Sequence, residues 1–377
     1  GTLTQNIIIE QEPAEFVNLE QNIYNVSVEG GELDIRFSTN IAEDELLIYG
    51  SLGTGTWLTQ ETKTRASSSY MLNLTVLPNT DGVSRTAYIY FVKVTDMESI
   101  VVEIVTIIQR GEVASGFTDY SSDKKVRVLQ TAKLGKGLPI VLMGDGFIDT
   151  EINDGTYDAV MDKTFENLFT EEPIKSLRDY FNVYAVTAVS KHNIFGTGYE
   201  TALGCELAGG NSTGISGEDN AVQRYVQCVD NIDMSETLAV VILNSPAYAG
   251  TTYFGYTNQT KVVEFAIAYC PVIYDLQSES FRQVLVHEAV GHGFAKLEDE
   301  YAYQENGTIS SKEIKNVQYL QTLGWAQNVD FTSDPSQVLW SAFLNDNRYV
   351  SEKLGVFEGA CTYIKGAYRP SEESMMN

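Results

Sequence analysis

Short runs of alternating hydrophobic and polar residues, rich in β-branched side chains, fill the chain from about residue 1 to residue 112. A period of two is typical of β-strands that bury one face. Turn signals such as Gly30-Gly31 and Asp81-Gly82 separate the runs. Short strands at this spacing predict an all-β immunoglobulin-like sandwich over residues 1–112. The predicted strands are Ile7–Glu10, Tyr24–Val28, Leu33–Ser38, Leu46–Tyr49, Tyr70–Leu77, Arg85–Val94 and Val101–Gln109.

The pattern changes after Gly111–Asp123, a polar segment rich in glycine and serine that we interpret as a linker. Beyond it, apolar runs of strand length alternate with runs of helical periodicity, which predicts an α/β domain over residues 120–377. The run Leu238–Leu243 is continuously apolar, as expected of a strand inside a sheet. The other predicted strands are Val126–Gln130, Leu138–Met143, Phe181–Val189 and Val262–Val272, and the predicted helices include Tyr157–Phe169 and Ile314–Leu323.

A further helix is predicted from about Phe281 to Lys296. Ser280, with Gln283 three residues later, has the signature of a capping box at its start. The apolar residues that would face the core are Val284, Leu285, Ala289 and Phe294.

This helix and the residues after it read VHEAVGHGFAKLEDEY (286–301) and contain two of the chain's three histidines. A zinc hydrolase needs neutral imidazoles to hold the metal, a carboxylate to activate water, and a third ligand that leaves one position open. We expect His287 and His292 to bind one zinc ion per chain. Glu288 would act as the general base on metal-activated water and then protonate the leaving amine. The third histidine, His192, has the setting of an ordinary surface residue.

The two histidines lie five residues apart, whereas the usual HExxH motif places them four apart on one helical face. Five steps on a regular α-helix separate two side chains by roughly 140°, too far to share a metal. A single-turn π-bulge absorbs one residue and restores a common face. The spacing therefore predicts a local widening, with Gly291 as the residue that tolerates it most easily.

The sequence leaves the third ligand open among three consecutive acids. We expect Asp299 first, then Glu300 and last Glu298, because Asp299 and Glu300 follow the helix end, where the chain can fold back toward the metal. At least one of the three acids would belong to a solvated helix end.

Three segments in order resemble the IgA-peptidase family of zinc metallopeptidases: VHEAVGHGFAKLEDEY, Val141–Phe147, and Gly366–Pro370 through Ser374-Met375-Met376. The resemblance covers most of residues 120–377. It implies a zincin-like, specifically metzincin-like, fold in which Met376 or Met375 forms a methionine turn beneath the metal. The five-residue histidine spacing, and Ala295 in place of a glycine, depart from the family pattern.

Further candidates are Tyr301 and Tyr368 for stabilising the oxyanion, and Arg369 for a substrate carboxylate. For each of these three residues, the alternative is a role in packing. The segment Asn244–Tyr248 follows a strand and is a candidate rim of a substrate cleft, or a turn. Asp149–Asp158 resembles a calcium loop, but its sixth residue is Asp154 where an EF-hand needs glycine, so calcium is possible but unsupported.

The N-terminal strands loosely resemble BACON modules of secreted bacterial enzymes. The residues that carry this resemblance are Gly55–Trp57, Leu72–Pro78, Arg85–Ile89 and Thr106–Gly111. It implies glycan or mucin adhesion, and the alternative is a structural spacer.

A net charge of −26 argues against a nucleic-acid partner, because no basic stripe exists to neutralise phosphates. No apolar run is long enough to span a membrane. The chain opens at Gly1-Thr2, from which we expect a secreted or surface-anchored protein whose export signal has been removed. The four cysteines match no zinc or redox motif, and a disulfide is slightly favoured between Cys205 and Cys228.

These features together predict a secreted or surface-anchored zinc endopeptidase that cleaves host or extracellular proteins and glycoproteins. One alternative is a catalytically weakened, peptidase-like adhesin that binds glycan or protein. Another is a zinc amidase acting on cell-wall peptide or another amide. Family membership alone does not fix IgA as the substrate.

Overall fold

The computed structural model describes residues 15–50, 57–66, 69–79, 85–95, 99–109, 118–196, 198–207, 214–258, 261–303 and 306–377. The chain divides into two compact units. One comprises Gly1–Gly116 with Ala208–Thr213, and the other comprises Phe117–Leu207 with Gly214–Asn377. The proposed linker Gly111–Asp123 lies partly outside the described residues, so its limits remain a prediction.

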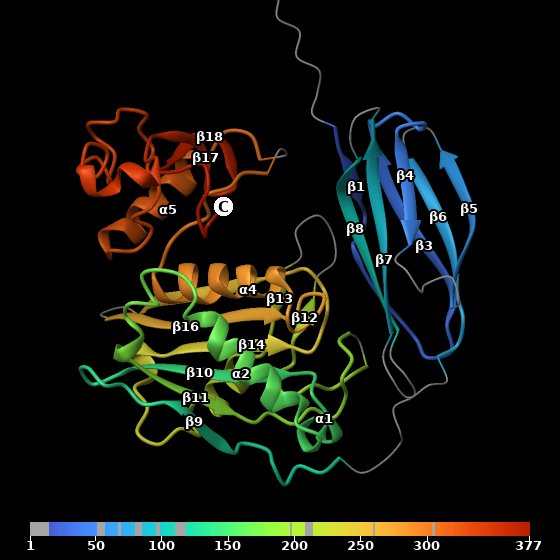
Figure 1. Cartoon of the computed structure of the whole chain (residues 1–377), viewed down its shortest axis with the longest axis horizontal. Helices are drawn as coiled ribbons and strands as arrows, with labels where there is room; N and C mark the ends of the chain where they lie inside the picture. The colour runs from blue at the N-terminus through green and yellow to red at the C-terminus, as the bar shows by residue number, and fades with distance from the viewer. Residues whose placement is uncertain are drawn as a thin grey trace, which may run out of the picture. The chain divides into compact units, whose positions relative to one another are not determined.

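The first unit is a β-sandwich of two four-stranded sheets (Figure 1). One sheet has the order β1-β3-β6-β5 and the other β2-β8-β7-β4. Inward-facing side chains from both sheets, among them Ile35, Phe91 and Ile107, form one core. The strands are β1 (Val17–Leu19), β2 (Ile23–Val26), β3 (Gly31–Thr39), β4 (Leu46–Gly50), β5 (Leu58–Ala66), β6 (Ser69–Val76), β7 (Arg85–Val94) and β8 (Ser99–Gln109).

Six of the predicted strands correspond to β2, β3, β4, β6, β7 and β8, whereas the predicted strand Ile7–Glu10 lies outside the described residues. Two strands, β1 and β5, were not predicted. β1 has only three residues, too short for a periodic signal. β5 reads LTQETKTRA and is mostly polar, as is common in a strand at the edge of a sheet.

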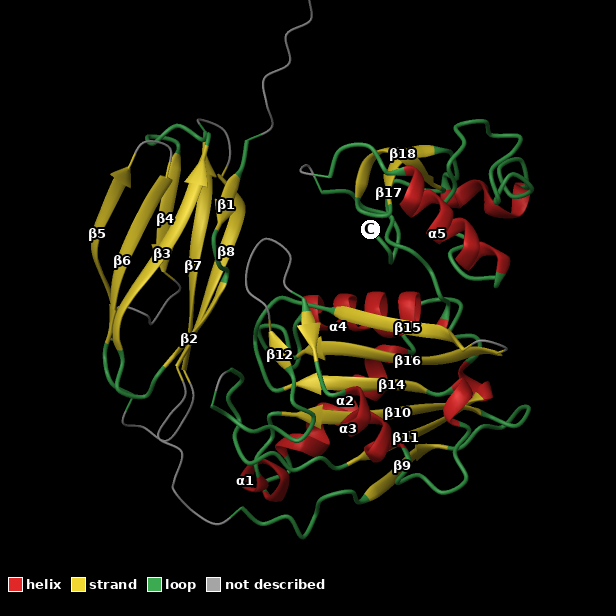
Figure 2. Ribbon diagram, turned by 180° about the vertical axis from the view of Figure 1, so that it is seen from behind, coloured by secondary structure: helices red, strands yellow, loops and turns green. Residues whose placement is uncertain are grey.

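The second unit is built on a six-stranded sheet with the order β15-β16-β14-β10-β11-β9 (Figure 2). The four inner strands, β16, β14, β10 and β11, are parallel, while β15 and β9 run antiparallel at the two edges. The continuously apolar run Leu238–Leu243 forms the buried inner strand β14, as predicted. The other strands are β9 (Val126–Gln130), β10 (Leu138–Asp145), β11 (Phe181–Val186), β15 (Thr251–Asn258) and β16 (Lys261–Pro271).

Helices cover both faces of this sheet. Alternate residues of the strands pack in two separate cores because successive side chains point to opposite faces. α2 (Thr156–Leu168), α4 (Glu279–Leu285) and the π-helix η4 (Val286–Phe294) pack on one face. α3 (Asp219–Val226) packs on the other, as the two opposite views show.

The C-terminal part of this unit forms a small subdomain around its own apolar cluster. It contains α5 (Ser311–Thr322), η5 (Asn347–Glu352), β17 (Phe357–Ala360) and β18 (Tyr363–Arg369). Cys361 and Thr362 join β17 to β18 with φ of 52° and 66°, values that a two-residue hairpin turn requires. The amides of this turn donate to the carbonyls of Asp299 and Tyr301, so the turn holds the segment that follows η4.

Three smaller elements complete the order: the 3-10 helices η2 (Arg178–Tyr180) and η3 (Met234–Glu236), and the hairpin β12 (Glu206–Leu207) with β13 (Ile215–Ser216). α1 (Asp149–Asn153), Gly155 and α2 together account for most of the segment that resembled a calcium loop. None of the helices in the described part of the chain has the length and apolarity needed to cross a membrane.

Two local predictions were wrong. The helix before the histidines is capped by Ser278, whose side chain accepts from the amide of Phe281, and not by Ser280. All four cysteines are free, so Cys205 and Cys228 form no disulfide. Cys205 is buried, and the thiol of Cys228 donates to the carbonyl of Arg224 within one turn of helix.

Candidate metal centre

The helix that carries both histidines widens where the sequence predicted it to. α4 gives way at Val286 to the nine-residue π-helix η4. The amide of Ala295 donates to the carbonyl of Val290 at 2.9 Å, which is an i→i−5 bond. The predicted widening is therefore confirmed, although it extends over the whole of η4 rather than a single turn.

Gly291 also has a packing role that the sequence did not predict. A β-carbon added at this position would lie 2.0 Å from Sδ of Met376. Gly291 is therefore needed because the buried methionine packs directly against the helix backbone.

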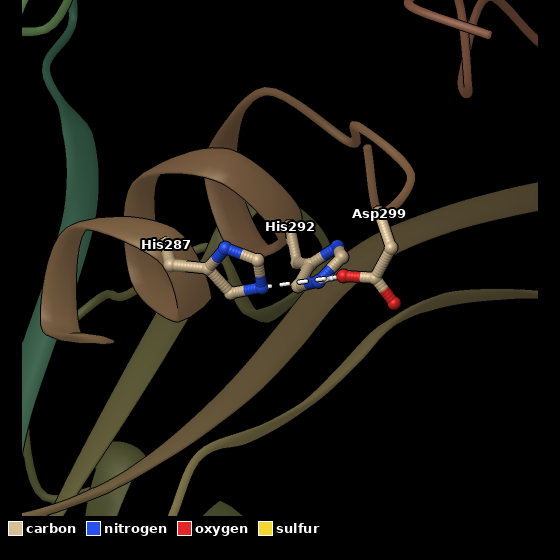
Figure 3. A group of neighbouring side chains, drawn as sticks. All are labelled: His287, His292 and Asp299. Carbon is tan, nitrogen blue, oxygen red and sulfur yellow. Dashed lines mark hydrogen bonds and ion pairs between the residues drawn. The ribbon is translucent and has the colours of Figure 1, made fainter. Parts of the chain in front are cut away.

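The widening brings the two imidazoles together. The ring centroids of His287 and His292 are 4.8 Å apart, and the rings are nearly perpendicular at 89°. Asp299, past the end of η4, turns its carboxylate toward both (Figure 3). Its Oδ1 is 3.3 Å from Nε2 of His287 and 3.2 Å from Nε2 of His292. Within the described ranges, this is the one group of three or more histidine, cysteine or acidic residues close enough to hold a metal ion.

Backbone carbonyls fix how each imidazole is presented. Nδ1 of His287 lies 2.9 Å from the carbonyl of Met375, and Nδ1 of His292 lies 2.6 Å from that of Leu297. A carbonyl oxygen can only accept, so each Nδ1 carries a proton and donates it. In the neutral ring, Nε2 then presents a lone pair, which is the arrangement found in metal-binding histidines.

Two lone pairs and a carboxylate oxygen that face one another repel unless a cation lies among them. Without a metal, a proton fills that role. Burial lowers the pKa of His292, but the hydrogen bond to Asp299 and its charge raise it more, to about 9. Burial raises the pKa of Asp299, but the two histidines lower it to well below its usual range. Two imidazole nitrogens and one carboxylate oxygen suit zinc and leave a coordination position open.

Glu288 lies on the same helix, and only 6% of it is exposed. The hydroxyl of Thr252, on the edge strand β15, donates to its Oε2 at 2.7 Å. Burial raises the pKa of Glu288, against the lowering effect of the two histidines and Thr252. A carboxylate that is more basic than usual and lies beside the two imidazoles can accept a proton from water.

The other two acids of the segment have different surroundings. Glu300 is 3% exposed, and its carboxylate accepts from Asn328 at 2.9 Å and from Ser374 at 2.8 Å. Burial, then the charge of Asp299, raises the pKa of Glu298 to about 7. Of the three acids, Asp299 is the one that the structure places against both histidines.

The remaining candidates lie in several places. The ring of Tyr301 is 6.1 Å from that of His287, and its hydroxyl lies 3.4 Å from that of Tyr303. Met376 lies beneath the site, against Gly291. Tyr368 lies on β18, where its amide donates to the carbonyl of Asp330.

Two other candidates are engaged outside the cluster. The guanidinium of Arg369 donates to the carbonyls of Gly359 and Ser371, within the C-terminal subdomain. His192 accepts the amide of Glu200 and contacts the ring of Tyr199, as expected of a residue in a surface loop.

Sequence reasoning missed the part that Thr252, Gly250 and Lys296 play in supporting the site. A β-carbon at Gly250 would lie 2.4 Å from Oε1 of Glu288, so this glycine makes room for the carboxylate. Lys296 is 6% exposed, and its ammonium group donates to the carbonyls of Gly293 and Glu264, which ties the end of η4 to β16. No local pattern marks these residues, because Thr252 and Gly250 act on Glu288, and Lys296 on Glu264, across more than 30 residues of sequence.

An α/β domain with a histidine–carboxylate cluster and a buried glutamate beside a sheet edge is characteristic of a hydrolase. Residues 126–351 match the family described as IgA Peptidase M64. This match covers more than half of the chain, and the chain therefore belongs to that family, which indicates a peptidase. Residues 41–110 match the BACON family, described as "Putative binding domain, N-terminal". Both predicted resemblances are thus confirmed.

No curated protein matches the chain. Solved structures with weak similarity include WR4, an MSP family member of C. elegans, with 11% identity over 26% of this chain and 100% of that one and a TM-score of 0.19. The cysteine protease inhibitor EhICP2 from Entamoeba histolytica has 13% identity over 25% and 88% of the two chains and a TM-score of 0.20. A Bacteroides ovatus GH5 xyloglucanase has 12% identity over 61% and 47%, with a TM-score of 0.20. Scores this low carry no argument.

Proposed function

We propose that this protein is a zinc-dependent endopeptidase with a metzincin-like catalytic domain. The observation that carries the proposal is the convergence of two Nε2 atoms and one carboxylate oxygen, from His287, His292 and Asp299, within 4.8 Å of one another. These three residues would hold the zinc. Met376, packed beneath the widened helix, would form the floor of the site.

Zinc at this position would supply Lewis acidity, polarising the scissile carbonyl and making water acidic enough to attack near neutral pH. Glu288 takes the proton of the attacking water and delivers it to the leaving amine. Burial raises the pKa of the Tyr301 phenol, which therefore keeps its proton at neutral pH. Tyr301 can thus donate a hydrogen bond to the oxyanion.

An extended peptide is the substrate shape that the sheet favours. β15 is the edge strand next to η4, and its outer main-chain groups have no partner strand among the described strands. A peptide pairing with such an edge gains main-chain hydrogen bonds that do not depend on its sequence. A protein or glycoprotein is therefore the proposed substrate class.

The proposal predicts one zinc per chain and the loss of that zinc in His292→Ala. Metal analysis after dialysis, together with hydrolysis of a panel of unfolded and glycosylated proteins, provides the measurement. Removing one of three ligands opens the site and leaves the metal weakly held. Tightly bound stoichiometric zinc in the variant would refute the assignment of His292. A wild-type protein without zinc or hydrolysis, but with glycan binding, would favour the adhesin, and cleavage of cell-wall peptide alone would favour the amidase.

For the N-terminal sandwich we propose a binding role in an extracellular setting, as a domain of a secreted or surface-anchored bacterial protein. Tyr49 on β4 lies opposite Tyr90 on β7, with ring centroids 5.4 Å apart, and Tyr88 lies 6.4 Å from Tyr90 on the same face. Tyr49 is 45% exposed. Aromatic rings side by side on an exposed sheet face can pack against sugar rings.

Two truncated proteins, residues 1–112 and 120–377, test both the boundary and this division of labour. Each should fold alone because each has its own core. We expect hydrolysis only from the second, and glycan retention only from the first, weakened at least tenfold by Tyr90→Ala. Glycan arrays and peptidase assays measure the two activities. Glycan binding by the second fragment, or insolubility of both fragments, would contradict the proposal.

A further inference from the structure

Gly250, just before the edge strand β15, and Thr252, at its start, lie on two sides of the Glu288 carboxylate. Thr252 Oγ1 lies 2.7 Å from Oε2 of Glu288 and 3.0 Å from its backbone carbonyl. A hydroxyl has one proton, and hydrogen bonds to an ionised carboxylate are the stronger ones. The hydroxyl therefore donates to Oε2, and its backbone contact is the weaker of the two.

Gly250 limits the other side of the same carboxylate. A β-carbon there would lie 2.4 Å from Oε1 of Glu288 and 2.7 Å from Cγ1 of Val284. The side chain of Glu288 thus fits into a space that exists only because residue 250 is a glycine. Gly250, just before β15, therefore provides a gap for the carboxylate, and Thr252 at the start of β15 provides a hydrogen bond that fixes its orientation.

Of the adjacent pair Thr251 and Thr252, Thr252 is the one that donates a hydrogen bond to the Glu288 carboxylate. Side chains alternate along a strand, so Thr251 and Thr252 point to opposite faces. Thr251 Oγ1 accepts from the amide of Ile215 and donates to the carbonyl of Gly250, away from η4. In the described part of the chain, Thr252 is the residue whose side chain hydrogen-bonds to the Glu288 carboxylate.

We propose that Thr252 is a positioning residue that holds the Glu288 carboxylate in the orientation required for proton transfer. This inference rests on the proposed function. A free glutamate side chain has several rotamers, and a small displacement of a catalytic group from its productive geometry can cost about a hundredfold in rate. The edge strand that is proposed to pair with the peptide thus also orients the general base.

Four variants test the proposal, of which Thr252→Ala is used if Thr252→Val does not fold. Thr252→Val removes the hydroxyl but keeps the shape, whereas Thr252→Ser keeps the hydroxyl. Thr164→Val removes the hydroxyl of a buried threonine, which donates to the carbonyl of Val160 in α2, outside the site. We expect Thr252→Val to lower kcat about tenfold to a hundredfold, the effect of losing one hydrogen bond to a charged group. In Thr252→Val, KM and zinc content should stay near the wild-type values. Thr252→Ser should restore kcat to within about threefold of the wild-type value.

The crystal structure of Thr252→Val provides a readout that is independent of activity. We expect the Glu288 carboxylate to rotate from its wild-type position or to occupy more than one. An unchanged carboxylate, a kcat within twofold of wild type, or an equal loss in Thr164→Val would overturn the inference. If Thr252→Val does not fold, a kcat as low in Thr252→Ser as in Thr252→Ala would overturn it. A wild-type protein without zinc or hydrolysis would instead refute the proposed function, and the crystal structure would still decide the role of Thr252.

Discussion

Glu288→Gln is expected to keep one zinc per chain while the hydrolysis rate falls at least a hundredfold. A glutamine side chain has the same shape and can still accept the hydrogen bond of Thr252. It cannot take a proton from water, and general base catalysis typically contributes about a hundredfold to ten-thousandfold in rate. Metal analysis and kcat on any protein that the wild type cleaves would measure both effects.

The stability of the metal-free variant should not fall. Burial raises the pKa of Glu288, which means that the metal-free folded protein disfavours the ionised carboxylate at neutral pH. A neutral amide avoids that cost, so after removal of zinc the thermal midpoint of the variant should be equal to that of the metal-free wild type or slightly higher. Glu279→Gln, the same change at the start of α4 in an exposed ion pair with Arg282, provides the control and should leave the rate unchanged. An undiminished rate in Glu288→Gln would remove Glu288 from the mechanism.

The sequence predicted the inner strands of the α/β domain but not its edge strand β15. Leu238–Leu243 is buried along its whole length and could be recognised from composition alone. β15 reads TTYFGYTN, and Gly255, with φ of 79°, lies at an irregularity in its pairing with β16. An edge strand that is half polar and interrupted by glycine has no clear alternation, and for this reason it was missed.

The widened helix could be predicted because chemistry constrained it. Two histidines five residues apart can share one metal only if the helix departs from 3.6 residues per turn. The start of the same helix was assigned wrongly because Ser278 and Ser280 are both plausible caps, and local sequence does not separate them. The choice depends on contacts beyond the helix, since the hydroxyl of Ser278 also donates to the carbonyl of Ile273 in the loop that follows β16.

The proposed third ligand could not be assigned from sequence because Glu298, Asp299 and Glu300 are adjacent and chemically alike. The structure separates them through residues far away in the chain. Ser374 and Asn328 engage the Glu300 carboxylate, and the amide of Glu300 donates to the carbonyl of Met376. The C-terminal segment thus fixes the direction in which each acid points.

Asp299→Ala and Glu300→Ala are therefore expected to give opposite results. Loss of Asp299 removes the carboxylate that faces both imidazoles, so zinc affinity should fall by more than about a hundredfold, and hydrolysis with it. Changes at residues that only support a ligand already cost about tenfold to a hundredfold in metal affinity, and loss of the ligand itself should exceed that range. Competition with a chelator of known affinity measures the loss.

Glu300→Ala should retain zinc to within about a hundredfold of the wild-type affinity but unfold more easily, because Glu300 supports the ligand loop without facing the metal. Its removal breaks the hydrogen bonds from the amide of Asn328, which is half-buried, and from the hydroxyl of Ser374, which is exposed. A hydrogen bond to a charged group contributes about 1.5–3 kcal/mol, and because water reaches Ser374 we expect a loss at the low end of this range, which denaturant unfolding of the two variants would detect. If Glu300→Ala lost its zinc while Asp299→Ala kept it, Glu300 would be the third ligand, and the bound state would require a rearrangement of the segment between η4 and the C-terminal hairpin.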